Sequence, residues 1–162
     1  YEVLAEFGYV SDSYDADGVV SPLNTDMVFG EDRLGDILVK KFTGKIEQMP
    51  PVYSALKVNG RRACDIVRAG GKVVLKPRIV TVHEFKIKEY RWPLISFEVH
   101  CGSGTYVRSL IHDLGQVLGC GAYVKELRRT SISNYSVKDA VPSERVRLDD
   151  VIPIEKFLEK MI

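Results

Sequence analysis

The sequence predicts an α+β protein with a mixed, mainly antiparallel sheet and helices packed on it. Residues 77–90 alternate between apolar and polar side chains, and a second strand-like run, residues 94–101, follows a short turn that contains Pro93. Apolar residues recur at helical spacing in residues 31–42 and 106–118, and a glycine follows each run. Two adjacent strands and two amphipathic helices of this kind are typical of a sheet that is covered by helices.

The remaining strands are predicted from turn residues. Residues 1–10 are expected to form a strand that ends in the turn 11–18, which is rich in Asp, Ser and Gly. In residues 77–90, the odd-numbered positions from Ile79 to Ile87 are expected to make one largely apolar face. Residues 122–133 are expected to form a further strand or a helix-to-strand segment.

The helices are expected to begin and end at recognisable residues. Ser103 or Thr105 is the expected cap of the helix 106–118, and Gly119 its end. Residues 61–69 are expected to form a short helix after an Asn59-Gly60 turn, preceded by an extended segment that Pro50 and Pro51 impose. An amphipathic helix is expected over residues 152–162.

The composition excludes several classes of protein. The chain has 162 residues, 45% of them hydrophobic, and a net charge of +1, so it is not a disordered protein. No apolar run reaches the roughly 18 residues of a membrane span. The three cysteines, Cys64, Cys101 and Cys120, form no CxxC pair, which favours reduced thiols and a cytoplasmic location. Neither a nucleotide-binding glycine motif nor a metal-ligand spacing of His and Cys is present, so no cofactor and no metal are expected.

The charge is unevenly distributed along the chain. Residues 1–36 carry nine acidic side chains and one basic side chain, whereas residues 55–92 carry ten basic and three acidic ones. A basic segment of this kind is a candidate contact for a polyanion such as nucleic acid. A charged face that contacts only solvent is an equally good interpretation of the charge alone.

The segment Gly102–Leu110 has the residues of a functional site. It follows the second predicted strand and contains two glycines, which allow a close approach of the backbone to another group. Tyr106 could stack on a base, and the Arg108 guanidinium could pair with a carboxylate or a phosphate. A structural Tyr and a surface Arg would explain the same pattern.

Four motifs together resemble the TruB family of tRNA pseudouridine synthases. They occur in the order of the family and cover nearly the whole chain: Ser11-Asp12-Ser13-Tyr14-Asp15-Ala16-Asp17-Gly18, Pro51-Val52-Tyr53-Ser54-Ala55-Leu56-Lys57, Gly104-Thr105-Tyr106-Val107-Arg108-Ser109-Leu110 with Leu118-Gly119-Cys120-Gly121-Ala122, and Val124-Lys125-Glu126-Leu127-Arg128-Arg129. The resemblance implies a pseudouridine synthase fold and the conversion of uridine 55 in the tRNA T-loop to pseudouridine. It implies a flipped base, an aspartate nucleophile, no cofactor and no metal.

The resemblance also implies roles for individual residues. Arg108 would pair with the catalytic aspartate, Tyr106 and Leu127 would contact the flipped base, and Tyr1 would pack on it. Residues 48–76 would be a thumb-like insertion that binds the tRNA T-stem-loop, and the following residues would contact RNA: Tyr53, Lys57, Arg61, Arg62 and Arg68. Arg128 and Arg129 would extend that surface, although a salt bridge at the end of a strand is an equal interpretation. The protein is expected to be a monomer.

One motif of the family is absent. The catalytic aspartate of the family lies in a G-x-x-x-x-L-D-P-x-A-x-G motif, and the chain contains none. Asp12, Asp15, Asp17 and Asp113 match other positions of the family, so none is expected to be the nucleophile. The chain is therefore expected to be incomplete at its N-terminus: residues 1–148 would be a partial catalytic domain, inactive alone, and residues 149–162 the start of a truncated C-terminal PUA-like region. A non-catalytic RNA-binding module or tRNA chaperone of the same fold is the alternative.

Overall fold

The computed structural model describes residues 1–23 and 26–159. Residues Glu2–Leu127 form one compact unit, and Tyr1 with Arg128–Ile162 belongs to a second. The first unit contains the sheet, both long helices and the thumb segment, which we define as residues 48–76.

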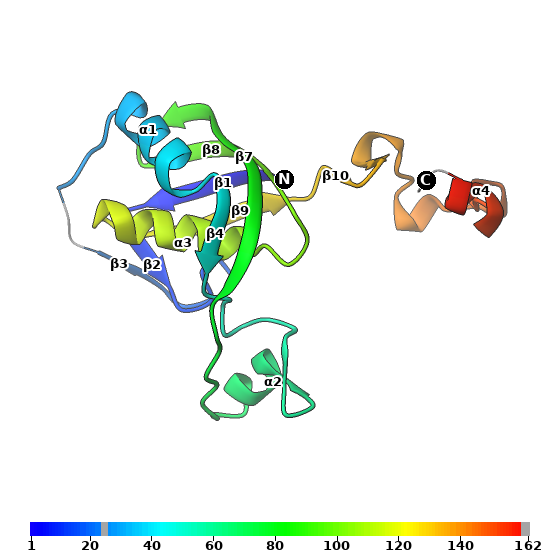
Figure 1. Cartoon of the computed structure of the whole chain (residues 1–162), viewed down its shortest axis with the longest axis horizontal. Helices are drawn as coiled ribbons and strands as arrows, with labels where there is room; N and C mark the ends of the chain where they lie inside the picture. The colour runs from blue at the N-terminus through cyan, green and yellow to red at the C-terminus, as the bar shows by residue number, and fades with distance from the viewer. Residues whose placement is uncertain (24–25, 160–162) are drawn as a thin grey trace. The chain divides into compact units, whose positions relative to one another are not determined.

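A five-stranded sheet with the order β4-β7-β8-β1-β9 forms the centre of the first unit (Figure 1). Its strands are β4 (Gly44–Gln48), β7 (Arg78–Arg91), β8 (Leu94–Cys101), β1 (Glu2–Phe7) and β9 (Ala122–Arg128). The pairs β4/β7, β7/β8 and β8/β1 are antiparallel, which confirms the predicted fold class. Alternate residues of β1 and β8 are buried, so one face of the sheet carries the core.

Two helices supply the other side of the core. Helix α1 (Glu31–Lys41) buries Leu34 and Leu38, and Phe42 at its end packs edge-on against Phe85 of β7. Helix α3 (Val107–Leu118) buries most of one face and ends at Gly119, whose φ of 75° is left-handed, as predicted. The predicted caps of α3, Ser103 or Thr105, are wrong. The N-cap residue is Tyr106, and its side chain makes no capping hydrogen bond.

The predicted apolar face of residues 77–90 is wrong for the first half of the strand. Val80 and Val82 are buried, whereas Ile79 is 66% exposed. The pairing of β7 with β8 shifts register between Val82 and Glu84, and Phe85 is the next buried residue. An irregularity of this kind inserts one residue, so the buried positions change from even to odd numbers.

Glycines divide the N-terminal region differently from the prediction. The expected strand 1–10 breaks at Gly8, where φ is 87°, into β1 and β2 (Tyr9–Ser11), and β2 pairs with β3 (Val20–Pro22). The hairpin of β2 and β3 therefore includes the turn of residues 11–18, which we call the acidic turn. Gly44, expected only to end a helix, is also the first residue of β4.

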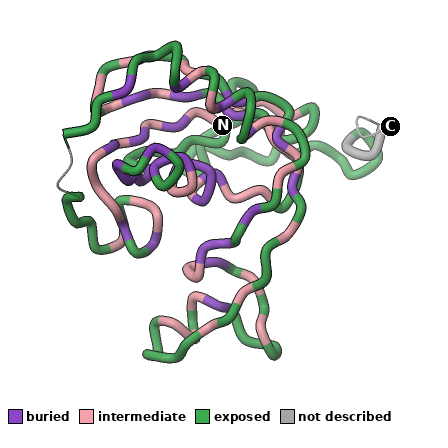
Figure 2. The backbone as a smooth tube through the Cα atoms, turned by 60° about the vertical axis from the view of Figure 1, so that its left-hand side comes forward, coloured by how far each residue is buried: buried purple, intermediate pink, exposed green. Residues whose placement is uncertain are grey.

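The thumb segment is a small hairpin followed by a short helix. Strands β5 (Lys57–Val58) and β6 (Arg61–Arg62) pair across the predicted Asn59-Gly60 turn. Because the two arginines belong to this hairpin, helix α2 spans only Ala63–Arg68. Figure 2 shows few buried positions in the thumb segment, in contrast to the sheet and α3. The thumb segment therefore exposes its charged side chains.

The second unit consists of short elements. Strands β10 (Ser131–Ile132) and β11 (Tyr135–Ser136) form a hairpin, and three short 3-10 turns, Val137–Asp139, Ser143–Arg145 and Leu148–Asp150, lead to helix α4 (Ile154–Glu159). The predicted segment 122–133 is thus two strands, β9 and β10. The last residues of the predicted helix 152–162 lie outside the described residues. Within the described chain, none of the helices has the length and apolarity needed to cross a membrane.

The carboxyl of Asp113 on α3 predicts a dependence of stability on pH. Burial raises its pKa from 3.8 to about 6, so between these values the folded chain binds more protons than the unfolded chain. Its contribution to the free energy of unfolding is therefore greatest at low pH and is lost as pH rises through about 6. We expect Asp113→Asn to be more stable than the wild type at pH 7 by about 1 kcal/mol after solvent screening, and to lose this advantage near pH 4.

Urea unfolding of both proteins from pH 4 to pH 7 measures this difference. His112, whose pKa burial lowers, is present in both proteins, so its opposite contribution cancels. Asp36→Asn, at an exposed ion pair of α1, is the matched control. A difference between Asp113→Asn and the wild type that is constant over this range would contradict the account.

Candidate active site

A cleft of about 770 Å³ opens where the acidic turn, the thumb segment and the start of α3 meet. The turn contributes Asp12, Ser13, Asp15 and Asp17, the thumb segment contributes Tyr53, Ser54, Cys64 and Arg68, and the start of α3 contributes Tyr106 and Arg108. The cleft therefore combines carboxylates, guanidinium groups and two aromatic rings.

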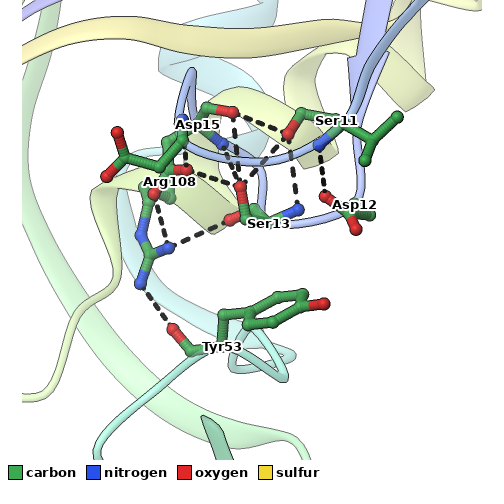
Figure 3. Close-up of polar contacts among 8 residues, drawn as sticks. Ser11, Asp12, Ser13, Asp15, Tyr53 and Arg108 are labelled. Atoms are coloured by element: carbon green, nitrogen blue, oxygen red, sulfur yellow. Dashed lines mark hydrogen bonds and ion pairs between the residues drawn. The ribbon is translucent and has the colours of Figure 1, made fainter. Parts of the chain in front are cut away.

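Arg108 connects all three segments (Figure 3). Its Nη1 donates to Asp15 Oδ2 at 2.6 Å and to the carbonyl of Ser13 at 3.0 Å. Its Nη2 donates to the carbonyl of Tyr53 at 2.8 Å. The side chains of Arg108 and Asp15 are each only 21% exposed, so the ion pair is largely shielded from solvent. The sequence alone did not identify Asp15 as the partner.

Short polar side chains fix the shape of the acidic turn. Ser11 Oγ donates to the carbonyl of Asp15 at 2.6 Å, and Asp12 Oδ1 accepts from the amide of Val19 at 2.8 Å. The other oxygen of Asp15, Oδ1, accepts from the hydroxyl of Ser13 and from the amide of Asp17. Asp and Ser form such local bonds readily, which is why this sequence makes a stable turn. The carboxylate of Asp15 is thus bonded through both oxygens.

A buried amide fixes the start of α3. Gln48, at the end of β4, accepts from the amide of Tyr106 at 2.8 Å through Oε1 and donates to its carbonyl at 3.0 Å through Nε2. Ser109 Oγ donates to the carbonyl of Met49 at 2.8 Å. Gln48 thereby holds the N-cap residue Tyr106, next to Thr105, one of the two residues predicted as the cap. The contact joins residues 58 positions apart, so no local pattern in the sequence indicates it.

Arg78 is a second residue that the sequence analysis did not single out. Its guanidinium lies 5.7 Å from the centre of the Tyr106 ring, within the range of a cation–π contact. The contact joins the first residue of β7 to the start of α3. Arg78 therefore supports the ring that was expected to contact a base.

The structure brings together only some of the residues predicted from sequence. Tyr53, Arg68, Tyr106 and Arg108 line the cleft. Lys57, Arg61 and Arg62 are exposed on the thumb hairpin, and Leu127 is 45% exposed at the end of β9. In the second unit, the guanidinium of Arg129 lies 5.5 Å from the centre of the Tyr1 ring, and Arg128 is exposed.

Ion pairs separate the basic residues into two groups. Three of the four bases of β7 have acidic neighbours: Lys86 pairs with Glu84, Lys88 with Glu2 and Arg91 with Glu89. In the described part of the chain, no salt bridge engages the bases of the thumb segment, Lys57, Arg61, Arg62, Arg68, Lys72 and Lys76. The thumb segment therefore carries six basic side chains that no salt bridge among the described residues compensates.

The cleft contains a guanidinium group that can bind an anion, Arg108, and aromatic rings on which a planar group can stack. The guanidinium of Arg108 has five N–H donors, so its three contacts leave it able to bond a further carboxylate or phosphate. Across the described residues, no three His, Cys, Asp or Glu side chains gather closely enough to hold a metal ion. The arrangement suits a planar polar ring and an anionic group bound side by side.

Comparison with known proteins identifies the class. Residues 1–107 match the model of the TruB family pseudouridylate synthase N-terminal domain, and residues 108–161 match that of the tRNA pseudouridylate synthase B C-terminal domain. The chain belongs to the TruB family of pseudouridine synthases.

Individual relatives agree with this assignment. The chain is 41% identical over 155 residues to the tRNA pseudouridine synthase B of Endomicrobium trichonymphae, covering 96% of the chain and 65% of the relative. It is 39% identical over 143 residues to that of Clostridioides difficile, covering 87% of the chain and 47% of the relative. The chain thus spans between about half and two thirds of the length of these relatives.

Solved structures confirm the fold. A chain in the crystal structure of a Cbf5–Nop10–Gar1 complex matches with a TM-score of 0.60 and 26% identity, covering 88% of this chain and 33% of that one. A chain in an H/ACA RNP bound to a substrate RNA containing 2'-deoxyuridine matches with a TM-score of 0.54 and 22% identity, over 86% of this chain and 30% of that one. The predicted pseudouridine synthase fold is therefore confirmed.

The shielded ion pair of Arg108 predicts a measurable loss of stability. Arg108→Ala would leave the half-buried carboxylate of Asp15 without its charged partner, so we expect the free energy of unfolding to fall by about 2 kcal/mol in urea unfolding. Arg91→Ala, which removes an exposed ion pair, is the matched control and should cost less than about 0.5 kcal/mol. Equal losses in the two variants would contradict the role assigned to Arg108.

Proposed function

We propose that this chain is part of a tRNA pseudouridine synthase that isomerises uridine 55 of the T-loop. The observation that carries the proposal is the guanidinium of Arg108, fixed by Asp15 and by the thumb segment in a cleft beside the ring of Tyr106. Membership of the TruB family supports the same conclusion. RNA binding, cytoplasmic action and a monomeric state are parts of this proposal.

The reaction needs a base that has left its stack. A flipped uridine would enter the cleft, where Tyr106 would contact the base. For Leu127 and Tyr1 we propose the roles that the family resemblance implies, an apolar contact with the base and a ring packed on it. An aspartate would bond to the ribosyl group as the bond from the sugar to the uracil nitrogen breaks. The released uracil would rotate and form a bond from a ring carbon to the sugar as the bond to the aspartate breaks. That carbon would lose its proton, and the nitrogen would gain one. The atoms of substrate and product are the same, so the reaction is an isomerisation; the family resemblance implies that it uses no cofactor and no metal.

Arg108 would act on the attacking carboxylate. An opposite charge favours the ionised form of a carboxylic acid and fixes its place, which is what a nucleophile requires. Asp15 already uses both of its oxygens within the chain, so it is the support of Arg108 and not the nucleophile. We therefore propose that a carboxylate outside these 162 residues is the nucleophile, and that these residues alone make no pseudouridine.

The thumb segment would hold the RNA. Phosphate contacts position a nucleic acid, and the uncompensated bases Lys57, Arg61, Arg62 and Arg68 are suited to make them. Tyr53 connects this segment to Arg108. Arg128 and Arg129 would also contact the RNA. We propose in addition that residues 1–148 are catalytic-domain sequence and that residues 149–162 begin a PUA-like region.

Binding to an unmodified T-stem-loop transcript tests the proposal. Because phosphate contacts release counterions, we expect the affinity to fall steeply with salt. The double variant Arg61→Ala/Arg62→Ala should reduce the slope of log affinity against log salt by about two, or about one for each lost phosphate contact. Lys40→Ala, at an exposed ion pair on α1, should leave the slope unchanged.

The same mixtures test the assignment of the nucleophile. Uridine and pseudouridine have the same mass, so the RNA is digested after incubation with the purified chain and its nucleosides are separated by chromatography. We expect no nucleoside with the retention of pseudouridine. Pseudouridine formed by the 162-residue chain would show that its own carboxylates suffice. An affinity that does not respond to salt would instead contradict RNA binding by the thumb segment.

A further inference from the structure

The acidic turn has a second contact with α3, one helical turn beyond Arg108. The ring of Tyr14 stacks on the ring of His112 with centres 3.8 Å apart and planes 14° apart. Residues four positions apart lie on the same face of a helix, so Arg108 and His112 face the turn together. Between them they contact three consecutive residues: Ser13, Tyr14 and Asp15.

The backbone of Tyr14 is held in an uncommon conformation. Its φ of 68° lies in the left-handed region, which is unfavourable for a residue other than glycine. Its amide donates to the carbonyl of Ser11 at 3.2 Å, and its carbonyl accepts from the amide of Val124 at 3.0 Å. These bonds fix the direction in which the side chain leaves the turn. The strained residue therefore directs its ring at α3.

The other half of the stack is a histidine that makes little use of its polar atoms. His112 is half-buried, and within the described chain its buried Nδ1 has no hydrogen-bond partner. Such an unpaired buried atom is unfavourable. Burial also lowers the pKa of the imidazole, which favours its neutral form. The contact that His112 does make is the stack of its ring on the ring of Tyr14.

We propose that Tyr14 and His112 are positioning residues whose stacked rings hold the carboxylate of Asp15 on the guanidinium of Arg108. The consequence for catalysis rests on the proposed function, but the clamp itself does not. The two rings act through Arg108 and need no contact with the substrate.

The need for a clamp follows from the geometry of the turn. The bonds of Ser11, Ser13 and Asp12 lie within the turn, so they fix its shape and not its place on α3. Asp15 can orient Arg108 only if something other than Arg108 holds Asp15 against the helix. Asp15 directly follows Tyr14, and the bridge from Asp15 to Val124 ties the turn to β9. The stack is a side-chain contact that ties the turn to α3 independently of Arg108.

Four variants of the 162-residue chain distinguish the effect of the stacked rings from the effect of the strained backbone at Tyr14. Tyr14→Gly removes the ring but tolerates φ of 68°, so it keeps the backbone without strain. Tyr14→Phe keeps the ring and loses only the hydroxyl. His112→Ala and His112→Phe make the same comparison on the helix. Thermal unfolding reports whether each variant folds.

The readout is the rotation of the Arg108 guanidinium about its Cζ–Nε bond, measured by NMR of the side-chain nitrogens. Bonds from both Nη atoms slow this rotation, and exposed Arg91 is the internal reference. We expect Tyr14→Gly and His112→Ala to speed the rotation by about tenfold, the effect of removing about 1.4 kcal/mol from a barrier. Tyr14→Phe and His112→Phe should resemble the wild type.

Each outcome decides the proposal. Unchanged rotation in folded Tyr14→Gly would overturn it, even if His112→Ala fails to fold. Faster rotation in Tyr14→Phe would also overturn it, since the ring would not be the cause. The measurement uses no RNA, so its failure leaves the proposed function intact. A wild-type chain that binds no T-stem-loop would refute the function and leave the clamp unaffected.

Discussion

The guanidinium of Arg108 is the interaction on which the candidate site depends. Its partners Ser13, Asp15 and Tyr53 lie 95, 93 and 55 residues away in the sequence, and they belong to the acidic turn and the thumb segment. A shielded charge that loses its partner is costly, so the fold must deliver all these acceptors to one point. The internal bonds of the turn and the grip of Gln48 on the start of α3 both serve this requirement.

The same arrangement explains a net charge close to neutral in a protein proposed to bind RNA. The acidic first third of the chain supplies Asp15 for Arg108, and Glu2 and Glu6 for lysines of the sheet. Burial would raise the pKa of the Glu6 carboxyl, but hydrogen bonds from Tyr123 and Lys125 lower it, so Glu6 is held as an anion. Acidic groups thus neutralise several bases on the body of the fold, whereas no salt bridge in the described part of the chain compensates the bases of the thumb segment. Neutrality of the whole chain is compatible with a strongly basic surface.

Local sequence patterns predicted the features that depend on neighbouring residues. The helical spacing of 31–42 and 106–118, the Asn59-Gly60 turn and the glycine that ends α3 all specify their structure within a few residues. Other features depend on contacts between distant segments, which the spacing of apolar residues does not predict. They are the irregularity in β7, the pairing of β4 and the hydrogen bonds of the Gln48 amide. For the site, the motifs identified Tyr106 and Arg108. They did not identify Asp15 as the support of Arg108, because that pair forms only after the turn folds onto α3.

The central claim is that the cleft around Arg108 is where the RNA presents its uridine. NMR titration of the labelled chain with a T-stem-loop RNA tests it most directly. We expect the largest changes in chemical shift at Tyr106, Arg108 and the arginines of the thumb segment. Unaffected signals there, with changes concentrated instead at the separate 620 Å³ pocket around Phe7, Met27 and Trp92, would contradict the claim.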